Sequence, residues 1–153
     1  MMGAVLAALG VAVAYLAVVD WRYRRIPNAV VLPSILCAIV AAGAWQPAAL
    51  AGGAGWWLLF SFFHHRAAKH LRKGSSAAGR YLGGGDAKFA VVCGILSSWH
   101  GSGWVLLAMA AAGMLSTVAI LYRRHSRKLP NQRAVAMGPA MALGTLLAFL
   151  VTL

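Results

Sequence analysis

Residues 29–63 read AVVLPSILCAIVAAGAWQPAALAGGAGWWLLFSFF and contain no Lys, Arg, Asp or Glu. A helix crosses a lipid bilayer with roughly 20 apolar residues, and this stretch is nearly twice as long. It is interrupted at Gln46-Pro47, where proline removes a backbone N–H donor and ends a helix. We therefore expect two helices here, which cross the membrane in opposite directions and are joined by a short turn.

Three further stretches lack charged side chains, namely residues 1–19, 89–122 and 134–153. The longest of them is interrupted at Gly101-Ser102-Gly103 and predicts two helices, the first of which begins near Asp86. The other two predict one helix each. The expected fold is thus an all-α polytopic membrane protein with six transmembrane helices. The composition agrees, since 61% of residues are hydrophobic and 10% are charged, against about a quarter charged in soluble domains.

The basic residues predict the orientation of these helices. The formal net charge is +12, which in a soluble protein would suggest binding to nucleic acid. In a membrane protein, Lys and Arg collect instead in cytoplasmic loops, beside anionic lipid headgroups. We therefore predict no nucleic acid partner, cytoplasmic basic loops and both termini outside. The clusters are Arg22, Arg24 and Arg25; Arg66, Lys69, Arg72, Lys73, Arg80 and Lys88; and Arg123, Arg124, Arg127, Lys128 and Arg133.

The chain has only two acidic side chains, Asp20 and Asp86. The predicted topology puts Asp20 at the end of the first helix and Asp86 at the start of the fourth, both at the cytoplasmic boundary. Ionisable side chains at membrane depth are costly and are candidates for function. Structural alternatives are that Asp86 caps its helix and that Asp20 pairs with Arg22 or Arg24.

Two carboxyl groups that face one another can hydrolyse a peptide without metal or cofactor. Because two like charges at close range do not both ionise readily, the pair shares a proton. The ionised member activates a water molecule, and the protonated member polarises the carbonyl group. A helix dipole favours the charged form at a helix start, so Asp86 is the predicted base and Asp20 the predicted proton carrier.

Three local sequences carry a family resemblance. Asp20-Trp21-Arg22-Tyr23-Arg24-Arg25-Ile26-Pro27-Asn28 resembles the first-aspartate motif of the type IV prepilin peptidases. Gly83-Gly84-Gly85-Asp86-Ala87-Lys88 is similar to their GxGD motif, which carries the second aspartate. Met137-Gly138-Pro139-Ala140-Met141-Ala142-Leu143-Gly144 resembles the Gly-Pro segment of their last helix, although a preceding proline common in the family is missing.

The resemblance implies an aspartic endopeptidase of the bacterial inner membrane. Such enzymes remove the basic leader from prepilins or pseudopilins on the cytoplasmic side, just before an apolar helix. Asp20 and Asp86 would be catalytic, and no metal or cofactor would be needed. Glycines would let the backbone approach the substrate, Pro27 would end the first loop, Asn28 would cap the second helix, and Gly138-Pro139 would kink the last. The supporting residues are then Gly83, Gly85, Lys88, Arg22, Pro27, Asn28, Gly138 and Pro139.

The resemblance also predicts the domain organisation. Larger family members carry a methyltransferase region with paired CxxC motifs, whereas Cys37 and Cys93 here are single. Residues 1–153 are therefore expected to form one membrane-embedded peptidase domain without methyltransferase, as in the short branch associated with tight-adherence (Tad) pili. The alternatives are a small membrane transporter, a non-enzymatic subunit of a pilus or secretion machine, and a serine protease built on Ser97, Ser98 and His100.

Overall fold

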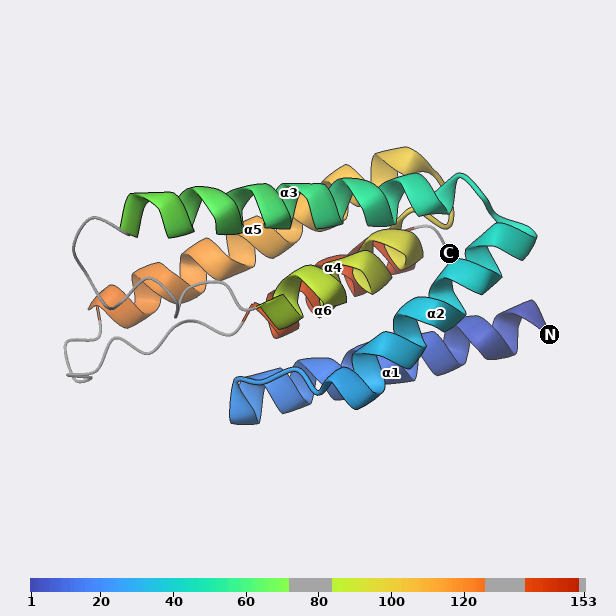
Figure 1. Ribbon diagram of the computed structural model, residues 1–153, viewed down its shortest axis with the longest axis horizontal. Coiled ribbons are helices and arrows are strands. Elements are labelled where there is room, and N and C mark those ends of the chain that lie inside the picture. The colour runs from blue at the N-terminus through green and yellow to red at the C-terminus, as the bar shows by residue number, and fades with distance from the viewer. Residues whose placement is uncertain (72–83, 126–136, 152–153) are drawn as a thin grey trace.

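A computed structural model describes residues 1–71, 84–125 and 137–151, and every regular element in these ranges is a helix (Figure 1). The six predicted helices are confirmed, and so are the two predicted interruptions, since turns near residues 46–48 and 98–101 separate consecutive helices. The fourth helix begins before its apolar stretch, as predicted. The helices are α1 (Met2–Tyr23), α2 (Asn28–Trp45), α3 (Ala49–Leu71), α4 (Gly84–Ser97), α5 (Ser102–His125) and α6 (Gly138–Leu150).

Among the described helices, α1 and α2 are long and apolar enough to cross a membrane. Shorter apolar segments lie within the other helices, at Ala49–Phe63, Gly103–Ala119 and Gly138–Phe149. The outer faces of α2 and α5 expose large apolar side chains, among them Leu36, Leu106 and Met114. A soluble monomer rarely exposes so much apolar surface, whereas a surface that meets lipid has this character.

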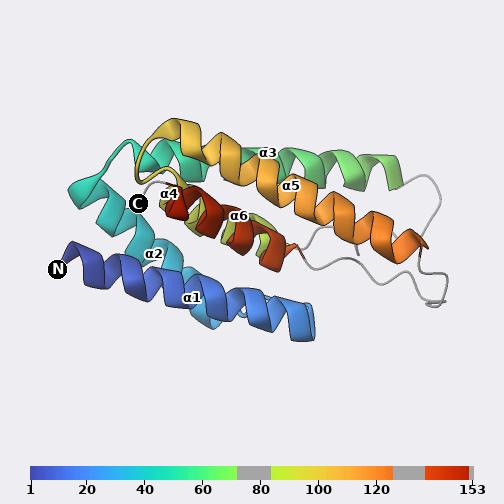
Figure 2. The same cartoon turned by 180° about the vertical axis from the view of Figure 1, so that it is seen from behind.

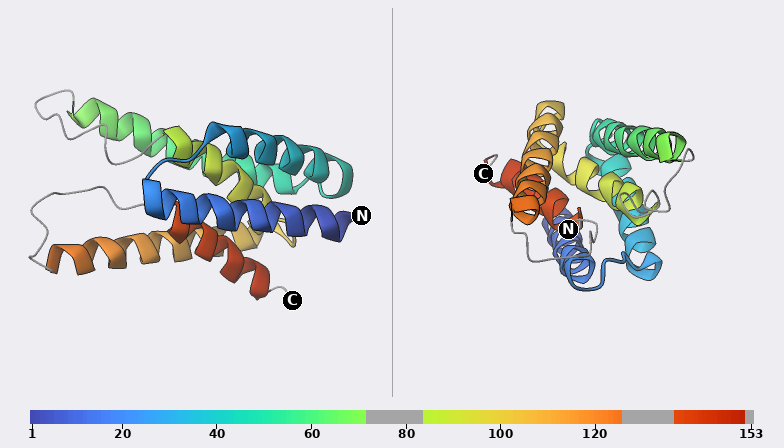
Figure 3. Two further views of the ribbon diagram at one scale, coloured as in Figure 1. Left: turned by 90° about the horizontal axis from the view of Figure 1, so that it is seen from below. Right: turned by 90° about the vertical axis from the view of Figure 1, so that its left-hand side faces the viewer.

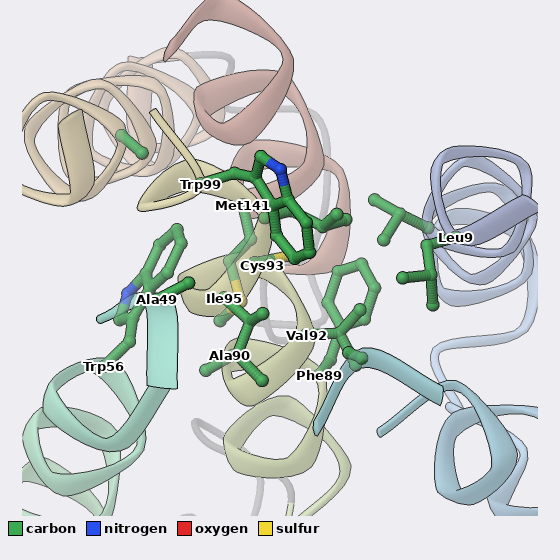
Figure 4. Packing of buried hydrophobic residues seen from close by; sticks show 14 of the residues in the cluster. Leu9, Ala49, Trp56, Phe89, Ala90, Val92, Cys93, Ile95, Trp99 and Met141 are labelled. Carbon is green, nitrogen blue, oxygen red and sulfur yellow. The ribbon is translucent and has the colours of Figure 1, made fainter. Parts of the chain in front are cut away.

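Helix α4 lies at the centre of the bundle and contacts each of the other five described helices. Its side chains fill the core, including Phe89, Val92, Cys93 and Ile95, all of which are almost completely buried (Figure 4). Helix α6 lies between α1 and α5 and also packs against α4 (Figure 2). A helix of 14 residues is about 21 Å long, which is shorter than the hydrocarbon layer. Because its neighbours surround it, α4 need not span that layer.

Helices α3 and α4 approach one another closely at glycines. A Cβ atom at Gly94 would lie 2.5 Å from the carbonyl oxygen of Gly52 and 2.8 Å from the Cα of Gly53. Ser98 joins the same two helices, since its hydroxyl donates to the Ala49 carbonyl at 2.9 Å and lies 2.7 Å from the Gly94 carbonyl oxygen. Close backbone contact of this kind gives van der Waals packing that does not depend on excluding water.

We expect Gly94→Ala to destabilise the fold by about 1–3 kcal/mol, because the added methyl group meets backbone that cannot rotate away. Thermal loss of the helical circular dichroism signal in detergent would report this. Gly113→Ala on α5 is the matched control, since no atom lies within 4 Å of its Cβ position and alanine is a better helix former than glycine. Equal melting temperatures for the two variants would contradict the packing argument.

Candidate active site

The candidate site lies at one end of the bundle. The end of α1 and the starts of α2, α4 and α6 are at this end (Figures 1 and 3), and α1 contacts α2, α4 and α6. Asp20 is in the last turn of α1, and Asp86 is in the first turn of α4. The fold therefore carries the two acids at the same end of the molecule, although 65 other residues separate them in the sequence.

Asp20 is buried, with 5% of its surface exposed. One carboxyl oxygen, Oδ2, accepts a hydrogen bond from the backbone N–H of Gly138 at 2.9 Å. Arg24 also acts electrostatically on this carboxyl group. It follows α1 in the left-handed conformation at φ 53° and donates its backbone N–H to the Asp20 carbonyl at 2.8 Å. The hydrogen bond from Gly138 means that the start of α6, the last helix in the chain, holds the Asp20 carboxyl group in place.

Gly138 is the first residue of α6 and leaves no room for a side chain. A Cβ atom there would lie 2.8 Å from Oδ2 of Asp20 and 3.0 Å from its Cβ. Pro139 follows in the first turn of α6, where the missing N–H costs no helical hydrogen bond. The prediction that Gly138-Pro139 kinks the last helix is therefore wrong, because the pair begins the helix and presents its N-terminus to Asp20.

Asp86 is half-buried and lies two residues after the first residue of α4. It is therefore inside the helix, and the alternative in which it serves as the N-cap residue does not hold. Gly85 packs closely against the loop after α1, since a Cβ atom there would lie 3.1 Å from the Cβ of Ile26. The predicted supporting residue Gly83 lies outside the described residues.

The helix dipoles do not distinguish the two acids in the way that we predicted. Asp20 is at the C-terminal end of α1, which disfavours negative charge. Its carboxyl group, however, also receives the first backbone N–H of α6, and a helix N-terminus favours negative charge. Both acids therefore meet a helix N-terminus, and the assignment of Asp86 as the base loses its electrostatic argument.

Lys88 and Asn28 connect α4 to α2. The ammonium group of Lys88 donates a hydrogen bond to Oδ1 of Asn28 at 3.0 Å. The prediction that Asn28 caps the second helix is wrong, because Pro27 occupies the N-cap position and its carbonyl accepts from the N–H groups of Val30 and Val31, each at 3.1 Å. Pro27 ends the first loop, as predicted, with ψ at 122°.

The remaining predicted supporting residue, Arg22, lies on the surface of the protein. Arg22 is exposed, and its guanidinium carbon lies 6.0 Å from the centroid of the Tyr23 ring. Sequence reasoning named Arg24 as a possible partner of Asp20, and Arg24 does act electrostatically on that carboxyl group, but it did not single out Ile26, which packs at Gly85. No local signal indicates the Ile26 contact, which joins segments far apart in the chain.

The serine alternative finds no support in the geometry. The hydroxyl groups of Ser97 and Ser98 are buried and donate to helix carbonyls, and the His100 ring lies against Phe149, with 5.3 Å between the ring centroids. Among the described residues, no group of three or more His, Cys, Asp or Glu side chains is placed to hold a metal ion.

Comparison with known proteins identifies one family. A sequence model described as the type IV leader peptidase family matches residues 7–122, which is most of the chain and includes Asp20 and Asp86. No curated protein and no solved structure matches.

Proposed function

The chain belongs to the type IV leader peptidase family and is a membrane protease, and we propose that it removes the basic leader from prepilins or pseudopilins. Asp20 and Asp86 would be the catalytic pair. The observation that carries this proposal is the placement of the only two acidic side chains of the sequence at one end of the bundle, with Asp20 buried and held by the Gly138 amide. Burying an ionisable carboxyl group among apolar helices is costly, and such groups in membrane proteins are candidates for function.

The reaction needs only the two carboxyl groups and one water molecule. The ionised carboxylate takes a proton from water, and the resulting hydroxide attacks the carbonyl carbon of the scissile peptide bond. The second carboxyl group, which is protonated, gives its proton to the carbonyl oxygen as the tetrahedral intermediate forms, and takes a proton back from a hydroxyl group of the intermediate when it collapses. The C–N bond then breaks as the first carboxyl group gives its proton to the leaving nitrogen. The products are the leader, with a new carboxylate, and the mature pilin, with a new amino group.

The supporting residues would fix the two acids relative to one another. Gly138 holds Asp20 from α6, whereas the Lys88–Asn28 hydrogen bond and the Gly85–Ile26 contact hold the start of α4 against α2 and its loop. Reacting groups placed in this way avoid the loss of rate that accompanies a small misplacement. These residues are therefore proposed to position the catalytic groups without reacting themselves.

The proposal includes an orientation in the bacterial inner membrane. The site end of the bundle would face the cytoplasm, all six helices would belong to one multi-pass domain over residues 1–153, and both termini would be outside. In support, α3 and α5 extend beyond the starts of α4 and α6 at this end (Figures 1 and 3), and exposed Arg66 lies near the end of α3. Basic helix ends favour contact with cytoplasmic anionic lipids. The assignment to the Tad pilus branch rests on the sequence motifs alone.

The position of the acids argues against a transporter. Ion and proton sites of transporters lie near the middle of the bilayer, whereas Asp20 and Asp86 are both at helix ends on one side of the bundle. A proton path across the membrane would need further ionisable groups within the helices. The charge-free stretches 1–19, 29–63, 89–122 and 134–153 supply no Asp, Glu, Lys or Arg for such a path.

Leader removal by the purified protein tests the proposal. The protein is reconstituted in lipid vesicles with a prepilin, and the product is identified by mass spectrometry. We expect a single cut between the basic leader and the apolar helix. The double variant Asp20→Asn/Asp86→Asn is the control for contaminating proteases. If the parent protein leaves a panel of prepilins and pseudopilins intact, the proposed function is wrong.

A further inference from the structure

Glycine contacts join four of the helices into two closely packed pairs. Gly94 brings α4 against α3, as described above. Gly144 brings α6 against α5 in the same way, since a Cβ atom there would lie 2.5 Å from the carbonyl oxygen of Ala108. Between the two pairs, the most extensive contact is that of α4 with α6. The α4–α6 interface therefore sets how one pair sits relative to the other.

A polar pair lies among the apolar side chains of this interface. A side-chain hydrogen bond joins the Cys93 thiol on α4 to the Thr145 hydroxyl on α6, and both side chains are buried. The Thr145 hydroxyl also donates to the Met141 carbonyl at 2.9 Å, so the thiol is the donor across the interface. An unbranched side chain such as Met141 adapts to more than one packing arrangement, whereas a single polar contact in an apolar interface specifies one register.

Cys93 and Thr145 are each two helical turns away from the candidate active site. Cys93 follows Asp86 by seven residues, and Thr145 follows Gly138 by seven. The two members of each pair therefore share one face of their helix and are about 10 Å apart along its axis. Helices α4 and α6 run in the same direction from the site end (Figures 1 and 3). Asp86 thus lies at the same level of the interface as Gly138, whose amide holds the Asp20 carboxyl group.

We propose that the hydrogen bond between Cys93 and Thr145 sets the spacing of the two acids, so that both are positioning residues. The inference rests on the proposed function. Helix α1, which carries Asp20, packs more extensively on α2 and α6 than on α4, and the start of α6 binds the carboxyl group itself. A slip of α6 along α4 would carry Gly138 and Asp20 away from Asp86. Two groups that react together tolerate little change in their spacing.

Removing the hydroxyl group of Thr145 is the first test. Valine has nearly the shape of threonine but no hydroxyl, so Thr145→Val breaks the hydrogen bond to Cys93 and keeps the bulk of the side chain. We expect kcat for leader removal to fall about 10-fold with KM little changed, because a misplacement of the acids costs rate and not binding. Thr145→Ser keeps the hydroxyl and should recover a kcat close to the parental value. If the side chain served packing alone, the smaller serine would be the worse variant.

Thr117→Val on α5 is the matched control. The Thr117 hydroxyl donates to the Gly113 carbonyl at 2.8 Å, which is the same bond within a helix that Thr145 makes to Met141, but Thr117 is exposed. We expect parental kinetics from this variant. If the parent cleaves and Thr145→Val cleaves as fast as Thr117→Val, the inference is wrong while the proposed function stands. If the parent cleaves no prepilin, the proposed function itself fails.

A disulfide across the interface is the second test. Exposed Cys37 is replaced by serine, and Thr145→Cys is introduced opposite the native Cys93. Oxidation by copper phenanthroline in lipid vesicles then locks α6 to α4 in the register of the structure. We expect the disulfide to form, as judged by mass spectrometry, and the oxidised enzyme to cleave at least as fast as the reduced one. The same protein with Cys93→Ala is the control for oxidation elsewhere.

Two results of this second test would overturn the inference. A disulfide requires the two residues to be in direct contact, so if none forms, Cys93 and residue 145 do not face one another and the proposed register is wrong. If the oxidised enzyme loses cleavage and regains it on reduction, α4 and α6 must move relative to one another to bring the acids together. The hydrogen bond would then hold a resting state and not the spacing used in the reaction.

Discussion

Leader removal is expected to fall by about 10²- to 10⁴-fold when either Asp20 or Asp86 is replaced by asparagine. Asparagine neither takes a proton from water nor donates one to nitrogen, so each variant loses one half of the acid–base pair. The sequence contains no other Asp or Glu side chain that could substitute. The turnover number on a purified prepilin measures the effect.

The structure explains why the Asp20→Asn variant should still fold. The amide oxygen of asparagine can accept the Gly138 N–H in place of Oδ2, so the hydrogen bond between α1 and α6 is kept. We expect the melting temperature and helical content to stay close to those of the parent. Because the acids act as a unit, the double variant should be about as slow as either single variant. An asparagine variant that retains cleavage within tenfold of the parent would remove that residue from the catalytic pair.

The helices were predictable because lipid imposes a simple rule on sequence. In a helical membrane protein, charge-free stretches form the helices and basic residues mark their ends. The break at Gln46-Pro47 was therefore found correctly, whereas the second break lies at residues 98–101, so that only Gly101 of the predicted Gly101-Ser102-Gly103 is outside a helix. The two acids were conspicuous because the sequence contains no other Asp or Glu. Composition, however, carries no information on which helix contacts which. The central position of α4, the shortest helix but one, was therefore not predictable.

The errors concern residues whose roles depend on distant partners. Asn28 at a helix start suggested a local cap, but its side chain accepts from Lys88, 60 residues later in the chain. Gly138-Pro139 suggested a kink, but the helix begins there and its first N–H meets Asp20. Local rules assign such residues local roles, and a single sequence gives no indication of a contact across the bundle. The site was thus predictable in its acids but not in the groups that hold them.

Gly138→Ala is expected to lower the turnover number about 100-fold while KM changes little. The alanine methyl group would lie 2.8 Å from Oδ2 of Asp20, so the carboxyl group must move away and lose its hydrogen bond. A misplacement of about 1 Å can cost 10²-fold in rate, and a change in turnover alone indicates a loss specific to the transition state. Steady-state kinetics on a purified prepilin would separate the two constants.

The matched control for this variant is Gly43→Ala on α2, where no atom lies within 4 Å of the Cβ position. It introduces the same methyl group into a helix, and we expect parental kinetics from it. The melting temperature distinguishes a positioning role from a structural one, because Gly138 is at a helix start where alanine is tolerated. If Gly138→Ala melts far below the parent, its loss of activity reflects folding. If it cleaves at the parental rate, the Gly138 amide does not hold Asp20 for catalysis, and the site must be fixed by the contacts of α4 with α2 alone.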